Sequence, residues 1–148
     1  MTGADTAVVV RPRKVLIASW VGAVVVVVLF TVIALLLRNT PTGVYFRTAD
    51  QVALVLMGLF IAGGVLLLAR PRVRADAEGV EVRNILVTRQ LAWADVEGIA
   101  FPDGASWARL DLPDDEYLSV MAIQAVDGAH AVDGITRLRE LRSAARGR

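Results

Sequence analysis

Two apolar segments without a charged side chain decide the fold of this chain: Val15–Leu37 (VLIASWVGAVVVVVLFTVIALLL) and Gln51–Ala69 (QVALVLMGLFIAGGVLLLA). They contain 23 and 19 residues. As α-helices they would be about 34 and 28 Å long, close to the roughly 30 Å hydrocarbon core of a bilayer. Because backbone groups inside a bilayer must be hydrogen-bonded within their own segment, both segments are predicted to be transmembrane helices.

These two segments divide the chain into five parts. A short N-terminal tail (1–14) precedes the first transmembrane helix (15–37), a short external loop (38–50) connects it to the second (51–69), and residues 70–148 remain. The last part is just long enough for one small soluble domain. Residues 1–10 show no periodic pattern, and we expect them to form an irregular terminus.

The basic residues around the two segments predict their orientation. Two arginines, Arg38 and Arg47, lie in the loop, and three basic residues lie on each outer flank. Because basic residues favour the cytoplasmic side, we expect a multi-pass protein of the cytoplasmic membrane with both termini in the cytoplasm. The six outer residues are Arg11, Arg13, Lys14, Arg70, Arg72 and Arg74.

Small residues recur four positions apart in both segments: Ala18 and Gly22 in the first, Gly58 and Ala62 in the second. In an antiparallel hairpin Gly22 would lie level with Ala62. Such small-xxx-small pairs permit close approach of two helices. They indicate either packing within the hairpin or a contact between copies of the chain.

After Arg70 the apolar residues alternate with polar ones, which is typical of half-buried antiparallel strands. Gly79 closes a tight turn after Asp76, where we expect a positive φ. The spacing predicts six or seven short strands in a small sandwich or barrel. They lie at about 73–75, 80–82, 86–92, 96–101, 106–112 and 117–123.

The final segment returns to helical spacing. We expect Asp127 to cap its first turn, and an apolar stripe to lie on the sheet. Arginines cluster in its last turns, where positive charge is favourable at the negative end of a helix. The stripe is Val132, Ile135, Leu138 and Leu141, and the arginines are Arg137, Arg139, Arg142 and Arg146.

Residues that metal and catalytic sites need are scarce. The chain has no cysteine, which excludes disulfides, thiolate chemistry and cysteine zinc sites, and His130 is the single histidine. Asp114, Asp115 and Glu116 lack the ligand spacing of a calcium loop, so we expect a solvated turn. Residues 70–148 hold 11 arginines and 13 acidic residues, a poor balance for nucleic acid binding. We expect no enzymatic activity, metal, cofactor or nucleic acid partner.

Several short motifs add a resemblance to a known family. They are Arg70-Pro71-Arg72, Asp76-x-x-Gly79-Val80, Leu91–Val96 (LAWADV), Trp107–Leu110 (WARL) and Ala122–Ala125 (AIQA). With the preceding hairpin they resemble the bacterial pleckstrin-homology (PH)-like domain of small actinobacterial membrane proteins, a family with a member named as a low-molecular-weight culture-filtrate antigen. The resemblance covers about residues 70–142. It implies a small α+β domain, an antiparallel sandwich or barrel of six to seven strands with a C-terminal capping helix, and no enzymatic role.

Two sets of residues are candidate sites. By alternation Trp107 shares a face with Arg109, and this pair is either an exposed anchor for a protein partner or a tryptophan packed over the sheet. Trp93 is expected in the core. The basic residues beside the helices, Arg70, Arg72 and Arg74 foremost, either bind anionic lipid headgroups or only set the orientation.

These features predict a non-enzymatic interaction module that recruits or supports a protein partner at the cytoplasmic membrane. Tethering would raise the local concentration of even a weak binding surface. The alternatives are a module that binds anionic lipid, and an accessory subunit of a larger membrane complex or a homo-oligomer.

Overall fold

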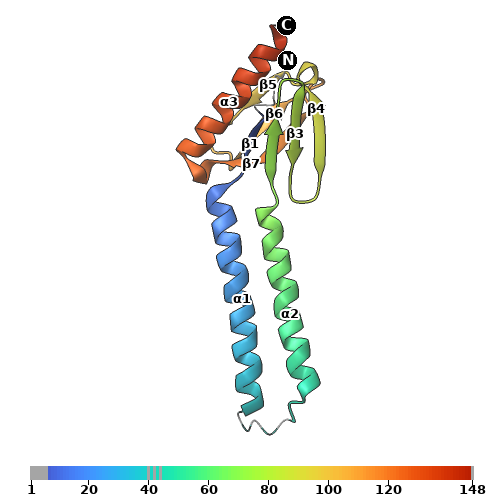
Figure 1. The fold of residues 1–148 in the computed structure, drawn as a ribbon, viewed down its shortest axis with the longest axis vertical. Coiled ribbons are helices and arrows are strands. Elements are labelled where there is room, and N and C mark those ends of the chain that lie inside the picture. Colours follow the sequence, from blue (N-terminus) through green and yellow to red (C-terminus); the bar gives the residue numbers. More distant parts are fainter. Residues whose placement is uncertain (1–6, 40, 42, 44, 148) are drawn as a thin grey trace, which may run out of the picture. The chain divides into compact units, whose positions relative to one another are not determined.

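The computed structural model describes residues 7–147 apart from residues 40, 42 and 44, and it contains two compact units. One unit is Val15–Ala69. The other combines the N-terminal residues up to Lys14 with Arg70–Arg148 and is called the domain below. Figure 1 shows the elements of each unit. The predicted fold class, a pair of long apolar helices followed by antiparallel strands and a C-terminal helix, is confirmed.

The apolar unit is a hairpin of α1 (Arg13–Asn39) and α2 (Thr48–Leu66), and a 3-10 turn, η1 (Leu67–Ala69), follows α2. Both helices are long and apolar enough to cross a membrane, and only 11% of the most apolar window of each is buried. A core helix of a soluble protein would be mostly buried. The exposed apolar surface is therefore the kind of surface that lipid covers.

Small side chains bring the two helices together. A Cβ on Gly58 would lie 2.6 Å from Cβ of Phe30, so this position requires glycine. Gly22 lies beside Val65 and not, as expected, beside Ala62. Ala18 is exposed and so does not pack within the hairpin; the alternative role, a contact between copies of the chain, stays a prediction. The buried positions of the two helices are Ser19, Ala23, Ala34, Gly58 and Ala62.

Polar side chains of the hairpin are hydrogen-bonded within it. The hydroxyls of Ser19 and Thr31 donate to carbonyls one turn earlier in α1, at 2.7 and 2.8 Å. Near the loop, Nη1 of Arg38 donates to Oε1 of Gln51 at 2.7 Å. Such bonds reduce the cost of placing polar groups in an apolar environment.

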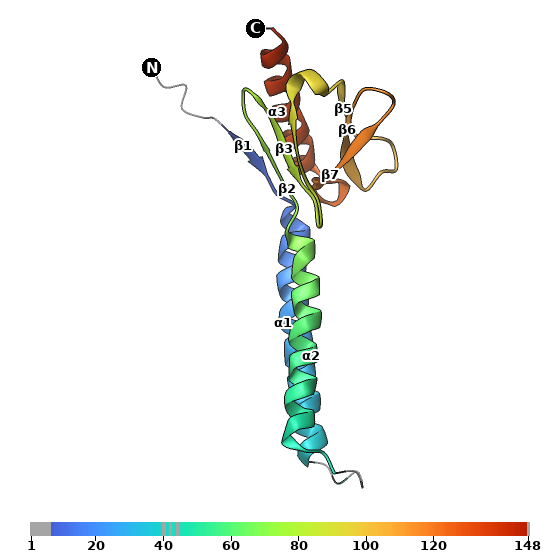
Figure 2. The same cartoon turned by 90° about the vertical axis from the view of Figure 1, so that its right-hand side faces the viewer.

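The domain contains two antiparallel sheets, which Figure 2 shows from the side. The first has four strands in sequential order and the second has three, also in sequential order. The strands are β1 (Val8–Val10), β2 (Arg72–Ala75), β3 (Gly79–Arg83), β4 (Thr88–Ala92), β5 (Gly98–Ala100), β6 (Trp107–Asp111) and β7 (Tyr117–Gln124).

The first strand comes from before the first long helix. Val8 pairs with Ala75 and Val10 with Val73, so β1 and β2 are neighbours although the whole hairpin separates them in the chain. The expectation of an irregular terminus is wrong for Val8–Val10, because three residues are too few to show alternation. The hairpin is therefore an insertion between two adjacent strands of one sheet.

The core lies between the sheets and the closing helix α3 (Ala129–Arg146). Trp93, in the 3-10 turn η2 (Trp93–Asp95), is buried as predicted, and its Nε1–H donates to the carbonyl of Asp76 at 2.8 Å. The most buried core side chains include Val73, Val82, Val96, Leu110, Val120, Ile123 and Leu138.

The closing helix differs from the prediction in two respects. Its buried face contains Ala131, Gly134, Ile135 and Leu138, whereas Val132 is exposed because the helix turns it away from the core. Asp127 does not cap this helix, whose N-cap is Gly128. Its carboxylate instead accepts hydrogen bonds from the backbone N–H groups of Arg13 and Lys14, at 3.1 and 3.0 Å.

Arginines of α3 bind backbone carbonyls in and just before β5, one edge strand of the second sheet. Arg139 donates to the carbonyl of Ile99 at 2.9 Å, and Arg146 donates to that of Val96 at 3.1 Å. Arg142 donates to the carbonyls of Val96 and Glu97, and its burial lowers its pKa from the ordinary value. The bond to Ile99 occupies a carbonyl group of an edge strand that would otherwise be open to pairing, and the others hold the segment that leads into it. Their role is more specific than the predicted interaction with the helix dipole.

Candidate functional site

The outer face of the second sheet carries the pair that the sequence singled out. Trp107 is 38% exposed, which favours the exposed interpretation over complete packing. A register shift between Trp107 and Ala108 sets the direction of this side chain, as bulges often do. Arg109 lies on the same face of β6, where its Nε is 2.8 Å from Oδ1 of Asp111. This contact is electrostatic, because the N–H does not point at the carboxylate as in a hydrogen bond.

Sequence reasoning missed a third member of this surface. Tyr117 pairs with Asp111 across β6 and β7 and is 62% exposed. The guanidinium carbon of Arg109 lies 5.6 Å from the centre of the Tyr117 ring, which is a cation–π contact. We call Trp107, Arg109 and Tyr117 the aromatic face. The strand register could have revealed Tyr117, but only once β6 and β7 were known to pair.

A second group of residues lies at the start of β2 and the end of β3. Arg72 and Arg83 are directly opposite each other in the sheet, and Arg70 precedes them in the chain. Arg70 donates from Nη1 to the carbonyl of Ile85 at 2.8 Å, and Arg72 donates from Nη2 to Oε1 of Glu81 at 3.2 Å. Within the described residues, the buried Nε atoms of all three arginines lack a hydrogen-bond partner. We call Arg70, Arg72 and Arg83 the arginine cluster.

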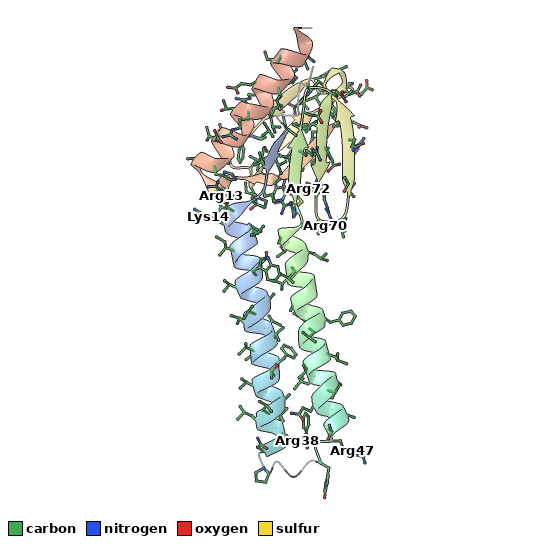
Figure 3. The ribbon with its side chains drawn as sticks, viewed as in Figure 1. Arg13, Lys14, Arg38, Arg47, Arg70 and Arg72 are labelled. Atoms are coloured by element: carbon green, nitrogen blue, oxygen red, sulfur yellow. The ribbon has the colours of Figure 1, made fainter. Side chains whose placement is uncertain are left out.

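The other four basic residues that were predicted to bind lipid or set the orientation are exposed. Arg11, Arg13 and Lys14 immediately precede the first apolar segment, and Arg74 lies on β2 beyond the arginine cluster. Figure 3 labels six of the basic residues that flank the two long helices. The cluster thus retains two of the predicted lipid-binding residues, adds Arg83, and leaves Arg74 outside.

Comparison with known proteins now identifies the domain. Residues 70–141 match the model of the bacterial PH domain. Uncharacterized protein Rv1417 of Mycobacterium tuberculosis is 47% identical over 137 residues, which cover 93% of this chain and 89% of that protein, and Mb1452 of Mycobacterium bovis matches equally well. The chain belongs to the bacterial PH domain family. Its first sheet nevertheless includes a strand, Val8–Val10, that lies outside the residues matched by the PH domain model.

Further comparisons define the extent of this likeness. Low molecular weight protein antigen 6 of Mycobacterium tuberculosis is 41% identical over 54 residues, which cover 36% of this chain and 47% of that protein. No solved structure matches the chain. The family therefore confirms the PH-like fold and the resemblance to small actinobacterial proteins.

The PH domain also carries a depression of 380 Å³ on the outer face of its first sheet. Carboxylates dominate its charged lining, since Arg74 faces Asp76, Glu78 and Glu81 there. Hydrogen bonds from Gln90 and Arg72 lower the pKa of Glu81. A pocket so rich in carboxylates is unsuited to a phosphorylated headgroup.

Gly79 lies beside this depression, and its role differs from the prediction. Its φ is not positive. Glycine is required because a Cβ at this position would overlap the backbone oxygen of Leu91 on the neighbouring strand. The turn itself is held by Asp76, whose Oδ1 accepts from the backbone N–H groups of Glu78 and Gly79, each at 3.0 Å.

The other candidates are dispersed. Asp114 and Asp115 occupy an exposed turn with φ values of 61° and 58°, and Glu116 follows them. His130 donates from Nε2 to the carbonyl of Arg11 at 3.0 Å, which ties α3 to the segment after β1. In the part of the chain that the structure describes, no three His, Cys, Asp or Glu side chains come close enough to hold a metal ion.

Proposed function

We propose that this protein is a membrane-anchored, non-enzymatic PH-like module that recruits or supports a protein partner through the aromatic face. The observation that carries the proposal is the exposed grouping of Trp107, Arg109 and Tyr117. Tryptophan, tyrosine and arginine are the residues most enriched where protein interfaces concentrate their binding energy. Anchoring by α1 and α2 keeps this surface near the membrane, where a weak affinity suffices because the effective concentration is high.

Site-specific photo-crosslinking in the native membrane tests this proposal. A photoreactive amino acid at Tyr117 should give a discrete adduct with the partner. The same amino acid at Val132, an exposed position on α3, should not give that adduct. Replacing Trp107 by alanine should then reduce the adduct formed from position 117. Equal labelling from positions 117 and 132, or an adduct unaffected by Trp107→Ala, would contradict the assignment.

The proposed orientation places both termini and the PH-like domain in the cytoplasm. It is supported by the six basic residues on the outer flanks of the helices against Arg38 and Arg47 in the loop. Pairing of β1 with β2 requires both ends of the hairpin to be on the same side, which agrees with two crossings. The cysteine-free chain permits a direct test in intact cells. A membrane-impermeant maleimide should label Tyr45→Cys, in the loop, and leave Glu78→Cys, in the domain, unlabelled.

Binding of anionic lipid is a second candidate, and the arginine cluster favours it. This cluster places three guanidinium groups at one end of β2 and β3, and guanidinium groups bind phosphate oxygens well. Full-length protein in nanodiscs should show slower amide exchange in β2 and β3 when the lipid is anionic than when it is zwitterionic. High salt and Arg83→Gln should remove the difference, whereas Arg74→Gln, outside the cluster, should preserve it.

We also propose two kinds of partner for the hairpin: further copies of this chain, or the subunits of a larger membrane complex. Both would use the lipid-facing surface of the hairpin, which includes Ala18. Purification in mild detergent followed by mass determination distinguishes them, since a homo-oligomer has a mass that is a multiple of 15.9 kDa.

A further inference from the structure

Among the exposed apolar side chains of the domain, two groups, which we call apolar points, adjoin residues that are hydrogen-bonded to the segments leading to the apolar unit. Leu86 and Val87 lie in the turn between β3 and β4, and they are 79% and 56% exposed. Val126, in the 3-10 turn η3 (Ala125–Asp127), is 52% exposed. A leucine and a valine exposed side by side in a turn contribute little to the core. Their exposure is therefore better explained by a contact outside the domain.

A residue next to each of these points is hydrogen-bonded to a residue that borders an apolar helical segment. Ile85, next to Leu86, accepts the hydrogen bond from Arg70, and Arg70 is joined directly to Ala69, the last residue of η1. Asp127, next to Val126, accepts hydrogen bonds from the backbone of Arg13 and Lys14, and Lys14 directly precedes Val15. Each apolar point is therefore adjacent in sequence to a residue that is hydrogen-bonded to Arg70 or to Arg13 and Lys14, which connect the domain to the apolar unit.

We infer that Leu86, Val87 and Val126 enter the boundary between headgroups and acyl chains of the bilayer that the hairpin crosses. This inference rests on the proposed membrane anchorage. The occupant is lipid because connectivity brings the bilayer surface to these side chains in every copy of the chain, without a separate partner. The domain is thereby attached to the membrane surface at two points in addition to the two helices.

The charges around the larger of the two points agree with lipid. From Val82 to Arg89 the chain contains two arginines, Arg83 and Arg89, and no acidic residue, although residues 70–148 as a whole are slightly acidic. Apolar side chains flanked by arginines are the combination that binds the interface of an anionic membrane. The opposite end of β3, with Asp76 and Glu78, is acidic, and its one exposed apolar side chain is the small Ala77. The end of β3 near Leu86 is thus basic and apolar and the other end is acidic, as expected if the first end faces an anionic membrane.

Single cysteines with an environment-sensitive fluorophore test the inference, since the chain has no native cysteine. The full-length protein is reconstituted in vesicles of phosphatidylcholine and phosphatidylglycerol. The labelled variants are Leu86→Cys and Val126→Cys. Glu78→Cys is the aqueous reference. This exposed position lies at the other end of the five-residue strand β3, about 17 Å from the turn that contains Leu86. Phe60→Cys, 85% exposed on α2, reports on the anchorage itself.

We expect blue-shifted emission at positions 86 and 126, with quenching by lipids that carry a nitroxide near the headgroup. The label at position 60 should be quenched by a nitroxide deep in the acyl region, and the label at position 78 by neither. If position 60 is quenched while position 86 or 126 behaves like position 78, the inference is wrong and the anchorage stands. If position 60 is not quenched, the proposed membrane anchorage fails and the inference fails with it.

Discussion

In the hairpin all the buried residues are small, whereas those of the domain include many large side chains. The contact between α1 and α2 contains Gly58, Ala34 and Ala62, and Phe60 projects outward almost fully exposed. In the domain, Leu110 and Leu138 are completely buried. The difference is the one expected if lipid surrounds the hairpin, as proposed above, and water surrounds the domain. Lipid solvates large apolar side chains as well as a protein core does, so only close backbone contact favours helix pairing there, whereas water drives large side chains inward.

The largest expected effect comes from placing a charge in the domain core through its N-terminal strand. Val10 is buried against Gly134 of α3, while its neighbour Val9 is half-exposed on the other face of β1. Val10→Asp should destabilise the domain by about 4 kcal/mol, because an unpaired buried charge costs roughly 3–5 kcal/mol. Val9→Asp should change stability by less than about 0.5 kcal/mol. Amide exchange of the domain in nanodiscs measures both, and equal effects would remove β1 from the core.

Truncation of leucines compares the two solvents directly. Leu138→Ala, in the domain, should cost about 3 kcal/mol, the middle of the roughly 2–5 kcal/mol range for buried leucines. Leu36→Ala, on the exposed surface of α1, should have little effect on unfolding of either unit, because lipid fills the space left by the removed methyl groups. Pulse proteolysis of the reconstituted protein separates the two variants. A comparable loss of stability for Leu36→Ala would mean that another protein chain, and not lipid, covers this part of α1.

The same difference explains which elements the sequence reveals. A transmembrane helix is a local property, since a long uncharged run satisfies its own backbone, and Val15–Leu37 therefore predicts α1 to within two residues. The strands of the domain depend on pairing at a distance. β1 has three residues and a partner across the hairpin, so no local pattern could reveal it. The same holds for Asp127, which precedes α3 in the chain but binds the first turn of α1.

The candidate site was predictable to a similar degree. Alternation along β6 identified Trp107 and Arg109 as neighbours on one face, because that face depends only on the period of a strand. Tyr117 required the register of β7, and Arg83 required that of β3. These residues are 8 and 11 positions away in sequence from Arg109 and Arg72, and only the turns between the strands determine which residues become opposite.

A glycine in the hairpin tests whether close contact alone holds the helices. Gly58→Val should separate α1 from α2 or displace Phe30, at a cost of about 1–3 kcal/mol for overpacking. Gly63→Val is the matched control, because nothing lies within 4 Å of a Cβ at that position. Spin labels on the two helices should report a longer and broader distance distribution for the first variant. An unchanged distribution would show that the pair tolerates a larger side chain at its contact.

Asp127 joins the start of α1 to the residues before α3, and its removal should have an intermediate effect. Asp127→Ala leaves two backbone N–H groups of the first turn of α1 without their acceptor, which should cost about 1–2 kcal/mol. The amides of Arg13 and Lys14 should exchange faster with solvent. Asp133→Ala removes only an exposed ion pair with Arg137, and it should leave those amides unchanged. Equal protection of Arg13 in all three proteins would contradict the capping role.

The smallest expected effect concerns the outer face of the first sheet, where water screens every interaction. Glu81 accepts hydrogen bonds from Gln90 and Arg72, each at 3.2 Å, and these bonds hold its pKa below the ordinary value of 4.5, with Arg74 adding positive charge. A carboxyl with a lowered pKa stabilises the folded state fully above the unfolded value. That contribution disappears as the pH falls through the folded value.

Glu81→Gln should therefore be less stable than the natural protein at neutral pH, by at most about 1 kcal/mol, as is usual for surface ion pairs. The difference should shrink below pH 4.5, and Gln90→Ala should weaken the same pH dependence because Gln90 contributes most to the lowered pKa. Thermal unfolding of the domain between neutral and acidic pH measures this. Parallel curves for Glu81→Gln and the natural protein would mean that solvent already cancels the interaction. Glu81 is thus expected to tolerate substitution without loss of the fold, unlike the leucine core or the glycine contact.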